Sequence, residues 1–157
     1  MIELFSRKPD ILKADYAGTL VPIPTDEELS SLSAIMLDDQ YYDFIKQGRY
    51  EVDGLSCLKP EHLIVLKARA WTDLKQSKLE GGKIDGKNIS KHRNDILRLY
   101  QIIDPELSLD LPDRVRDDLE LCLKQLGQEP LPLKELGLGR ILPEDLIEAL
   151  KRLYRLS

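Results

Sequence analysis

The chain has 157 residues, 42% of them hydrophobic, which is enough for one compact domain or for a small sheet unit joined to a helical one. Its apolar residues occur in short periodic groups, and no run approaches the roughly 20 residues needed to cross a bilayer. We therefore expect a soluble, cytoplasmic protein without a signal peptide or a membrane span. The net charge of −5 argues against broad nonspecific binding to nucleic acid.

Cysteine and histidine are too few to build a metal framework. Cys57 and Cys122 lie far apart and show no paired spacing, which is typical of buried thiols in a reducing compartment. His62 and His92 are the only imidazoles, so a His-rich metal site is excluded.

The first part of the chain alternates with a period of two and predicts short strands. We expect them over residues 1–6, 20–23, 33–37, 50–52 and 55–58. Asp53-Gly54 between the last two strands indicates a hairpin with a type I′ turn, which needs positive φ at both central residues. The segment 22–24 has a proline at each end, so it is expected to be an edge or a loop. A short helix is expected over 38–46.

From Pro60 onward the period changes to about 3.6, which is typical of helices. Four helices are expected, over about 60–78, 89–103, 112–126 and 143–155. The predicted fold class is therefore α+β, with a small mixed or antiparallel sheet over residues 1–58 followed by a four-helix region over 59–157. The chain begins directly in a predicted strand, so we expect either that a native upstream segment is missing from this sequence or that Met1 lies inside a longer reading frame.

Lys67 is the most unexpected residue of the first long helix. It falls near the middle of an apolar arc formed by Leu63, Leu66, Ala70, Trp71 and Leu74. Burial of an unpaired ammonium costs several kcal/mol, so Lys67 needs a carboxylate, carbonyl groups or an anionic ligand. The alternative is that its stem packs in the core while the charge reaches water.

Asp95 is the candidate partner of Lys67. It lies at the border of the apolar arc of the next helix, which contains Ile89, His92, Ile96, Leu99, Tyr100 and Ile103. A Lys67–Asp95 pair across the helix interface would aim an ammonium at a phosphate. An ordinary boundary ion pair is the alternative, and such pairs contribute little to stability.

The segment between these helices is locally basic. It contains Lys83, Lys87, Lys91, His92, Arg93 and Arg98, offset only by Asp85 and Asp95. Helical spacing does not place all of them on one face. The usual explanation is a solvated face, and the sharper one is a contact surface for phosphate or RNA.

Two early carboxylates, Glu3 and Asp15, are the candidates for a metal site. Glu3 alternates with Ile2 and Leu4 in a predicted strand. A lone carboxylate is weak evidence, because phosphoryl transfer with a divalent metal needs several oxygen ligands around the ion. The sequence also contains no P-loop and no GxSxG motif, so it gives no support to a P-loop enzyme or a serine hydrolase.

Two runs of the sequence resemble a known family. They are Leu-Lys-Pro-Glu-His-Leu-Ile-Val-Leu-Lys-Ala-Arg-Ala-Trp-Thr-Asp-Leu at 58–74 and Lys-His-Arg-Asn-Asp-Ile-Leu-Arg-Leu at 91–99. Together they resemble the later motifs of nucleotidyltransferase-like proteins of the abortive-infection (AbiEii/AbiGii-type) toxin class. The resemblance covers about residues 50–103.

The resemblance implies a nucleotidyltransferase-type core completed by a helical domain. By motif, Lys67 matches the first lysine, which faces nucleotide phosphates, and Lys91 and Asp95 match the second element, where Asp95 orients Lys67. The family's Gly-Ser turn and Asp-x-Asp metal pair are absent from this chain, and Glu3 would be a relic of the third carboxylate. The complete family enzyme uses magnesium and a nucleoside triphosphate (NTP), and neither is expected to bind tightly here.

Three hypotheses follow. The first is the rear part of a nucleotidyltransferase-like protein, with a nucleotide as its candidate partner, that does not catalyse transfer by itself. The second is a noncatalytic interaction module that associates with itself, with a partner or with a missing N-terminal half through an exposed strand edge. The third is a small RNA-binding protein that uses residues 83–98, with the steep salt dependence typical of phosphate contacts.

Overall fold

The computed structural model describes residues 3–7, 20–22 and 33–157, and the predicted α+β class is confirmed. The chain divides into two compact units, Met1–Gln47 and Gly48–Ser157. The second unit therefore begins before the expected boundary at 58/59 and includes the hairpin together with the helices. Its sequence contains 19 Lys and Arg against 19 Asp and Glu, so residues 1–47 carry the whole net charge of −5.

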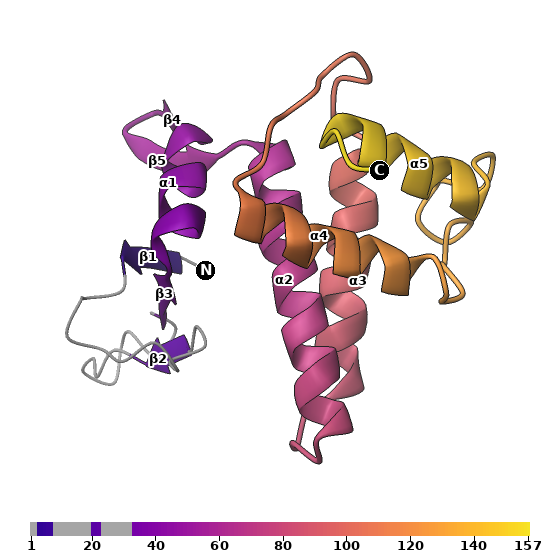
Figure 1. Ribbon diagram of the computed structural model, residues 1–157, viewed down its shortest axis with the longest axis horizontal. Coiled ribbons are helices and arrows are strands. Elements are labelled where there is room, and N and C mark those ends of the chain that lie inside the picture. Colours follow the sequence, from indigo (N-terminus) through magenta and orange to yellow (C-terminus); the bar gives the residue numbers. More distant parts are fainter. Residues whose placement is uncertain (1–2, 8–19, 23–32) are drawn as a thin grey trace. The chain divides into compact units, whose positions relative to one another are not determined.

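The first unit contains a three-stranded sheet in the order β1-β3-β2. Its elements are β1 (Glu3–Arg7), β2 (Leu20–Pro22), β3 (Ser33–Leu37) and α1 (Asp39–Gln47) (Figure 1). β1 runs parallel to β3 and β2 runs antiparallel to it. Pro22 lies in an edge strand, as predicted, where its missing N–H leaves the central ladder intact. The carboxylate of Asp38 accepts a hydrogen bond from the N–H of Tyr41 (3.0 Å) and so caps α1.

The second unit begins with a separate two-stranded sheet, formed by β4 (Arg49–Val52) and β5 (Leu55–Leu58). Asp53 and Gly54 join the strands with φ values of 51° and 76°, which confirms the positive φ that the type I′ turn requires. The helices that follow are α2 (Pro60–Leu79), α3 (Gly86–Tyr100), α4 (Asp113–Leu126) and α5 (Pro143–Leu153). No helix of the described residues is long and apolar enough to cross a membrane.

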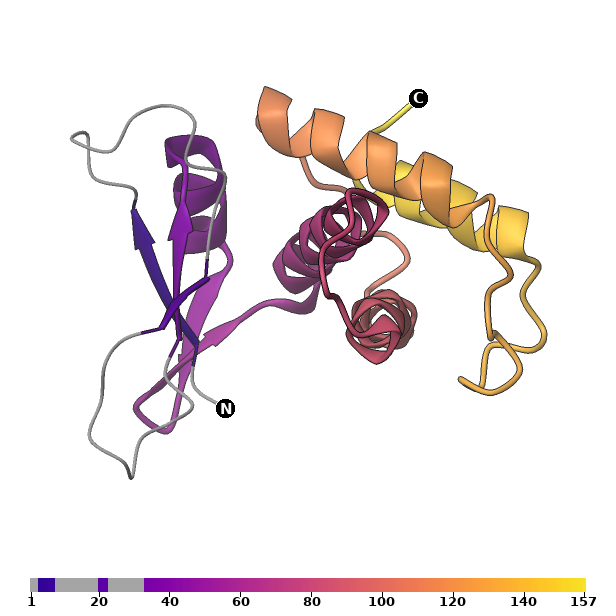
Figure 2. The ribbon, with the colours of Figure 1, turned by 90° about the horizontal axis from the view of Figure 1, so that it is seen from below.

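Helix α2 is the central element of the second unit. It packs along α3, and α4 crosses it (Figure 1), while α5 lies beside α4 (Figure 2). The buried residues of α2 are His62, Ile64, Val65, Ala68 and Trp71. Of the predicted apolar arc, only Trp71 is fully buried, and the other members are half-buried. The arc was wrong because a helix with neighbours on two sides does not bury a single stripe.

The C-terminal end of α5 is joined to distant parts of the second unit. The hydroxyl of buried Tyr154 donates to the main-chain carbonyl of Glu61 (2.6 Å), near the start of α2. Arg155 adopts a positive φ of 51° just past the helix, and Leu156 N–H donates to Lys151 O (2.9 Å). The guanidinium of Arg155 contacts both carboxylate oxygens of Asp110 at 2.9 Å. Arg155 thus takes a backbone conformation that glycine adopts more easily, just after α5. Through Asp110, its side chain fixes the connection between α3 and α4.

His62 joins the hairpin to α2. It is 3% exposed, and a Cβ atom at Gly48 would lie 2.2 Å from its ring carbon Cγ. Only glycine therefore allows the backbone before β4 to approach the imidazole so closely. The N–H of Lys59 donates to Gly48 O (2.9 Å) at the same point. Burial lowers the pKa of His62 below its ordinary value.

The lowered pKa predicts a pH dependence of stability. The unfolded chain binds a proton at His62 near its ordinary pKa, whereas the folded unit keeps the ring neutral to lower pH. The free energy of unfolding should therefore be highest above about pH 7 and fall as the pH is lowered toward about 5.5. Urea denaturation of the wild type and of His62→Gln measures this, and the variant should show a shallower slope. His92→Gln is the control, and an unchanged slope in His62→Gln would contradict the assignment.

Candidate functional site

The antiparallel packing of α2 and α3 brings together the two residues that the sequence singled out. Lys67 Nζ lies 3.6 Å from Asp95 Oδ2, and the side chains are 18% and 22% exposed. The predicted ion pair across the helix interface is therefore present. Asp95 also accepts from Arg98 Nη1 (3.4 Å), one turn further along α3. One partly buried carboxylate thus serves two cations.

Lys91 lies on the same side of α3 as Asp95 and Arg98, because residues four and seven positions apart share a helix face. It is exposed, and no carboxylate of the described residues lies within ion-pair distance of it. We call Lys67, Lys91, Arg98 and Asp95 the α2–α3 cluster. With three cations and one carboxylate, it has a local excess of positive charge in a unit whose formal net charge is zero.

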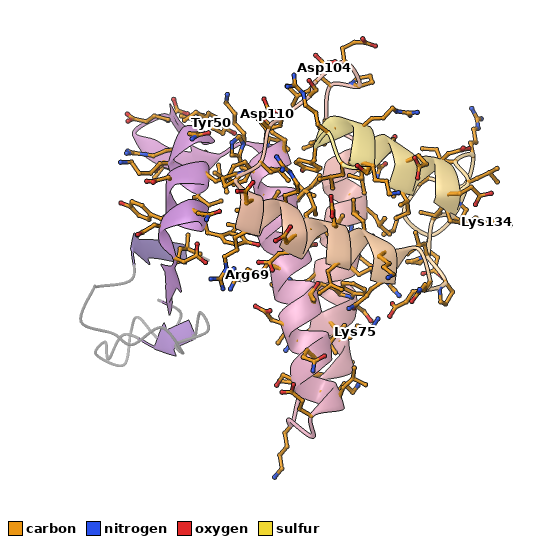
Figure 3. The ribbon with its side chains drawn as sticks, in the orientation of Figure 1. Tyr50, Arg69, Lys75, Asp104, Asp110 and Lys134 are labelled. Carbon is orange, nitrogen blue, oxygen red and sulfur yellow. The ribbon has the colours of Figure 1, made fainter. Side chains whose placement is uncertain are left out.

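Arg93 does not belong to this cluster, although it lies in the predicted basic stretch. Its side chain is 18% exposed, and its Nη1 lies 3.7 Å from Glu129 Oε2. Lys75 Nζ approaches the other oxygen of Glu129 at 2.7 Å and lies 4.6 Å from the ring centre of Trp71. Figure 3 labels Lys75 on α2. These contacts hold the end of α4 to α2 and α3, so Arg93 is a structural residue.

A magnesium site has no support in the part of the chain that the structure describes. No group of three or more His, Cys, Asp or Glu side chains there is arranged to hold a metal ion. The backbone of Glu3 lies opposite Ser33, at the start of edge strand β1. Asp15 lies outside the described residues. Cys122 is buried, and burial raises the pKa of its thiol to about 12, so it is no nucleophile at neutral pH. Cys57 is only half-buried, in contrast to the expectation from sequence.

The β4–β5 hairpin carries an apolar face that the sequence reading did not single out. Cross-strand pairing places Tyr50 opposite Cys57 and Val52 opposite Leu55. Tyr50, Val52 and Leu55 are 43%, 47% and 69% exposed, and Figure 3 labels Tyr50 on the hairpin. We call these four residues the hairpin face. The alternation of apolar and polar residues on both sides of Asp53-Gly54 was the signal that could have predicted it.

The opposite side of the hairpin is mostly polar, with Leu58 opposite Arg49 as its one apolar residue. It carries Arg49 and Glu51 on β4 and Ser56 on β5, and Arg49 Nε donates to Ser56 Oγ (2.6 Å). The hairpin is therefore amphipathic, with its apolar side open to solvent. Contiguous exposed apolar side chains of this kind mark sites of protein association more often than isolated ones do.

Comparison with known proteins gives no family and no relative. The chain matches no protein-family model, no curated protein and no solved structure.

The Lys67–Asp95 pair predicts a small coupling free energy. Because both side chains are partly exposed, the interaction should contribute about 0.2–1 kcal/mol to the free energy of unfolding. A double-mutant cycle of Lys67→Met and Asp95→Asn, followed by urea denaturation, measures the coupling directly. Arg98→Met is the control that removes the second cation of Asp95. Additive effects of the Lys67 and Asp95 substitutions would show that the pair does not form in solution.

Proposed function

We propose that this chain is a noncatalytic interaction module that associates with a second copy of itself through the β4–β5 hairpin. The observation that carries the proposal is the hairpin face, with Leu55 69% exposed beside Tyr50 and Val52. An isolated two-stranded hairpin is marginally stable in water, and a third strand or further apolar cover stabilises it. Each strand of this hairpin also has a free edge within its sheet, to which another strand can add.

Two groups of the second unit that could bind a charge or react are accounted for by their surroundings. The two partly buried charges of the α2–α3 interface satisfy each other, and burial keeps the thiol of Cys122 protonated. In the part of the chain that the structure describes, the apolar side chains of Tyr50, Val52 and Leu55 on the hairpin stay exposed. The most direct use of an exposed apolar face is association, because burial gains roughly 25 cal/mol for each Å² removed from water.

Self-association predicts a concentration-dependent mass that Leu55→Lys reduces. An ammonium within the buried contact must be desolvated without a partner, so the dissociation constant should rise at least about tenfold. Sedimentation velocity over a range of protein concentrations measures it. Ile102→Lys is the matched control, because Ile102 is 67% exposed but lies beyond α3. A wild type that stays monomeric up to its solubility limit would overturn the proposal.

A second candidate function is phosphate binding at the α2–α3 cluster. The presence of the Lys67–Asp95 pair favours it, since the resemblance to nucleotidyltransferase-like proteins assigns these residues to nucleotide phosphates. Lys91 and Arg98 would add positive charge around the same point. The complete family enzyme that the resemblance implies uses an NTP with magnesium, and its Gly-Ser and Asp-x-Asp elements are not in this sequence.

Calorimetric titration with ATP and magnesium tests this second candidate. If the α2–α3 cluster binds phosphate, Lys67→Ala should weaken binding by at least about tenfold, since a charged hydrogen bond contributes about 1.5–3 kcal/mol. Lys134→Ala, on the connection between α4 and α5 (Figure 3), is the control. No heat of binding in the wild type, or equal binding by Lys67→Ala, would exclude a phosphate site at Lys67.

A further inference from the structure

The phase of the hydrogen bonds in the hairpin determines which groups of β4 point outward. In an antiparallel ladder, hydrogen-bonded and non-hydrogen-bonded residue pairs alternate. A two-residue turn makes Val52 and Leu55 a hydrogen-bonded pair, so Tyr50 and Cys57 form the next one. The bond from Lys59 N–H to Gly48 O (2.9 Å) continues the same phase. The main-chain N–H and C=O groups of Arg49 and Glu51 therefore point to the free edge of β4.

We propose that a second copy of this chain pairs its β4 with this β4, antiparallel and about a two-fold axis at Tyr50. The inference rests on the proposed self-association and specifies how it occurs. In this register, Arg49 lies opposite Glu51 of the second copy, and Glu51 lies opposite Arg49. Each of these two pairs exchanges two main-chain hydrogen bonds, so all the outward groups of both residues are satisfied.

The side chains of this register also match. Arg49 and Glu51 share the polar side of the hairpin, so the pairing forms two ion pairs across the two-fold axis. On the other side, Tyr50 faces Tyr50 of the second copy in a non-hydrogen-bonded pair, where side chains come closest. Val52, Leu55 and Cys57 of both copies then form one apolar surface across four strands. The four-stranded sheet adds hydrogen bonds and apolar cover to a sheet that has only two strands in one copy.

The neighbouring registers of β4 are disfavoured by charge. If the two-fold axis moves by one residue along β4, it lies at Arg49 or at Glu51. The residue on the axis then faces the same residue of the second copy, so like charges oppose each other. Shifting the pairing by a single residue places the apolar side of one hairpin next to the polar side of the other. β5 reads Leu-Ser-Cys-Leu and has no charge with which to select a register. Among these registers, the one with its axis at Tyr50 pairs opposite charges, satisfies the outward main-chain groups and keeps the apolar faces on the same side.

Charge reversal tests the register. Arg49→Glu alone and Glu51→Arg alone each place like charges opposite each other, and each should raise the dissociation constant at least about tenfold. The double variant R49E/E51R should recover wild-type association. An equimolar mixture of the two single variants should associate more tightly than either alone, because their reversed charges complement each other. Sedimentation velocity measures all four samples, and Glu135→Arg on the exposed connection after α4 is the control.

Cross-linking provides an independent measurement. In a Cys57→Ser background, Tyr50→Cys should form an intermolecular disulfide under mild oxidation, because the axis places the two thiols opposite each other. The remaining cysteine, Cys122, is buried, so we expect no cross-link through it in this background. In the wild-type chain, rapid cross-linking through Cys57 would show pairing at β5 and would overturn the register.

The outcomes separate the two proposals. A wild type that does not associate removes the proposed function, and the register with it. A wild type whose association depends on Leu55 but not on Arg49 or Glu51 keeps the interaction module and overturns the register. Association that both charge reversals weaken, and that the double variant restores, supports both.

Discussion

The packing of α2 between its neighbours is the constraint on which the second unit depends. Trp71 is fully buried in this helix, which contacts both α3 and α4. Loss of such a large buried side chain typically costs about 3–5 kcal/mol. Because α2 has neighbours on two sides, few of its positions are free to be polar without a partner. Three cations of α2 accordingly meet carboxylates beyond the helix: Lys67 meets Asp95, Arg69 meets Asp118 and Lys75 meets Glu129.

This packing also explains which features could be predicted from the sequence. The strand positions, the turn at Asp53-Gly54 and the edge position of Pro22 follow from local chemistry, and each was predicted correctly. The Lys67–Asp95 pair was predictable because a lysine among apolar residues requires a partner and Asp95 lay on the next helix. The predicted arc of α2 was wrong, since a helical wheel assumes one buried side and nothing in the sequence of α2 announces a second neighbour.

Other parts of the second unit depend on contacts between distant residues and could not be predicted. The bidentate contact of the Arg155 guanidinium with the Asp110 carboxylate joins positions 45 residues apart. It also involves a positive φ at an arginine, which no local rule favours. Likewise, Gly48 reads as an ordinary loop glycine until the ring of His62 is found against it. The resemblance to nucleotidyltransferase-like proteins concerns this same helical region. Since no known family or structure matches the chain, that resemblance stays a prediction.

The hairpin is attached to α2 at its base and has its free edges and apolar face beyond that point. At the base, the bond from Lys59 to Gly48 and the close contact of His62 fix where β4 begins. These contacts order the backbone before any partner arrives, so the entropy cost of association is lower than for a disordered strand. A preordered strand whose outward groups are unsatisfied within the described chain is suited to add another strand. The same contacts favour one register of pairing, because they fix the base of the hairpin and therefore the positions of Arg49 and Glu51 along β4. The contact between a glycine and a buried imidazole thus links the core of the second unit to the specificity of its proposed self-association.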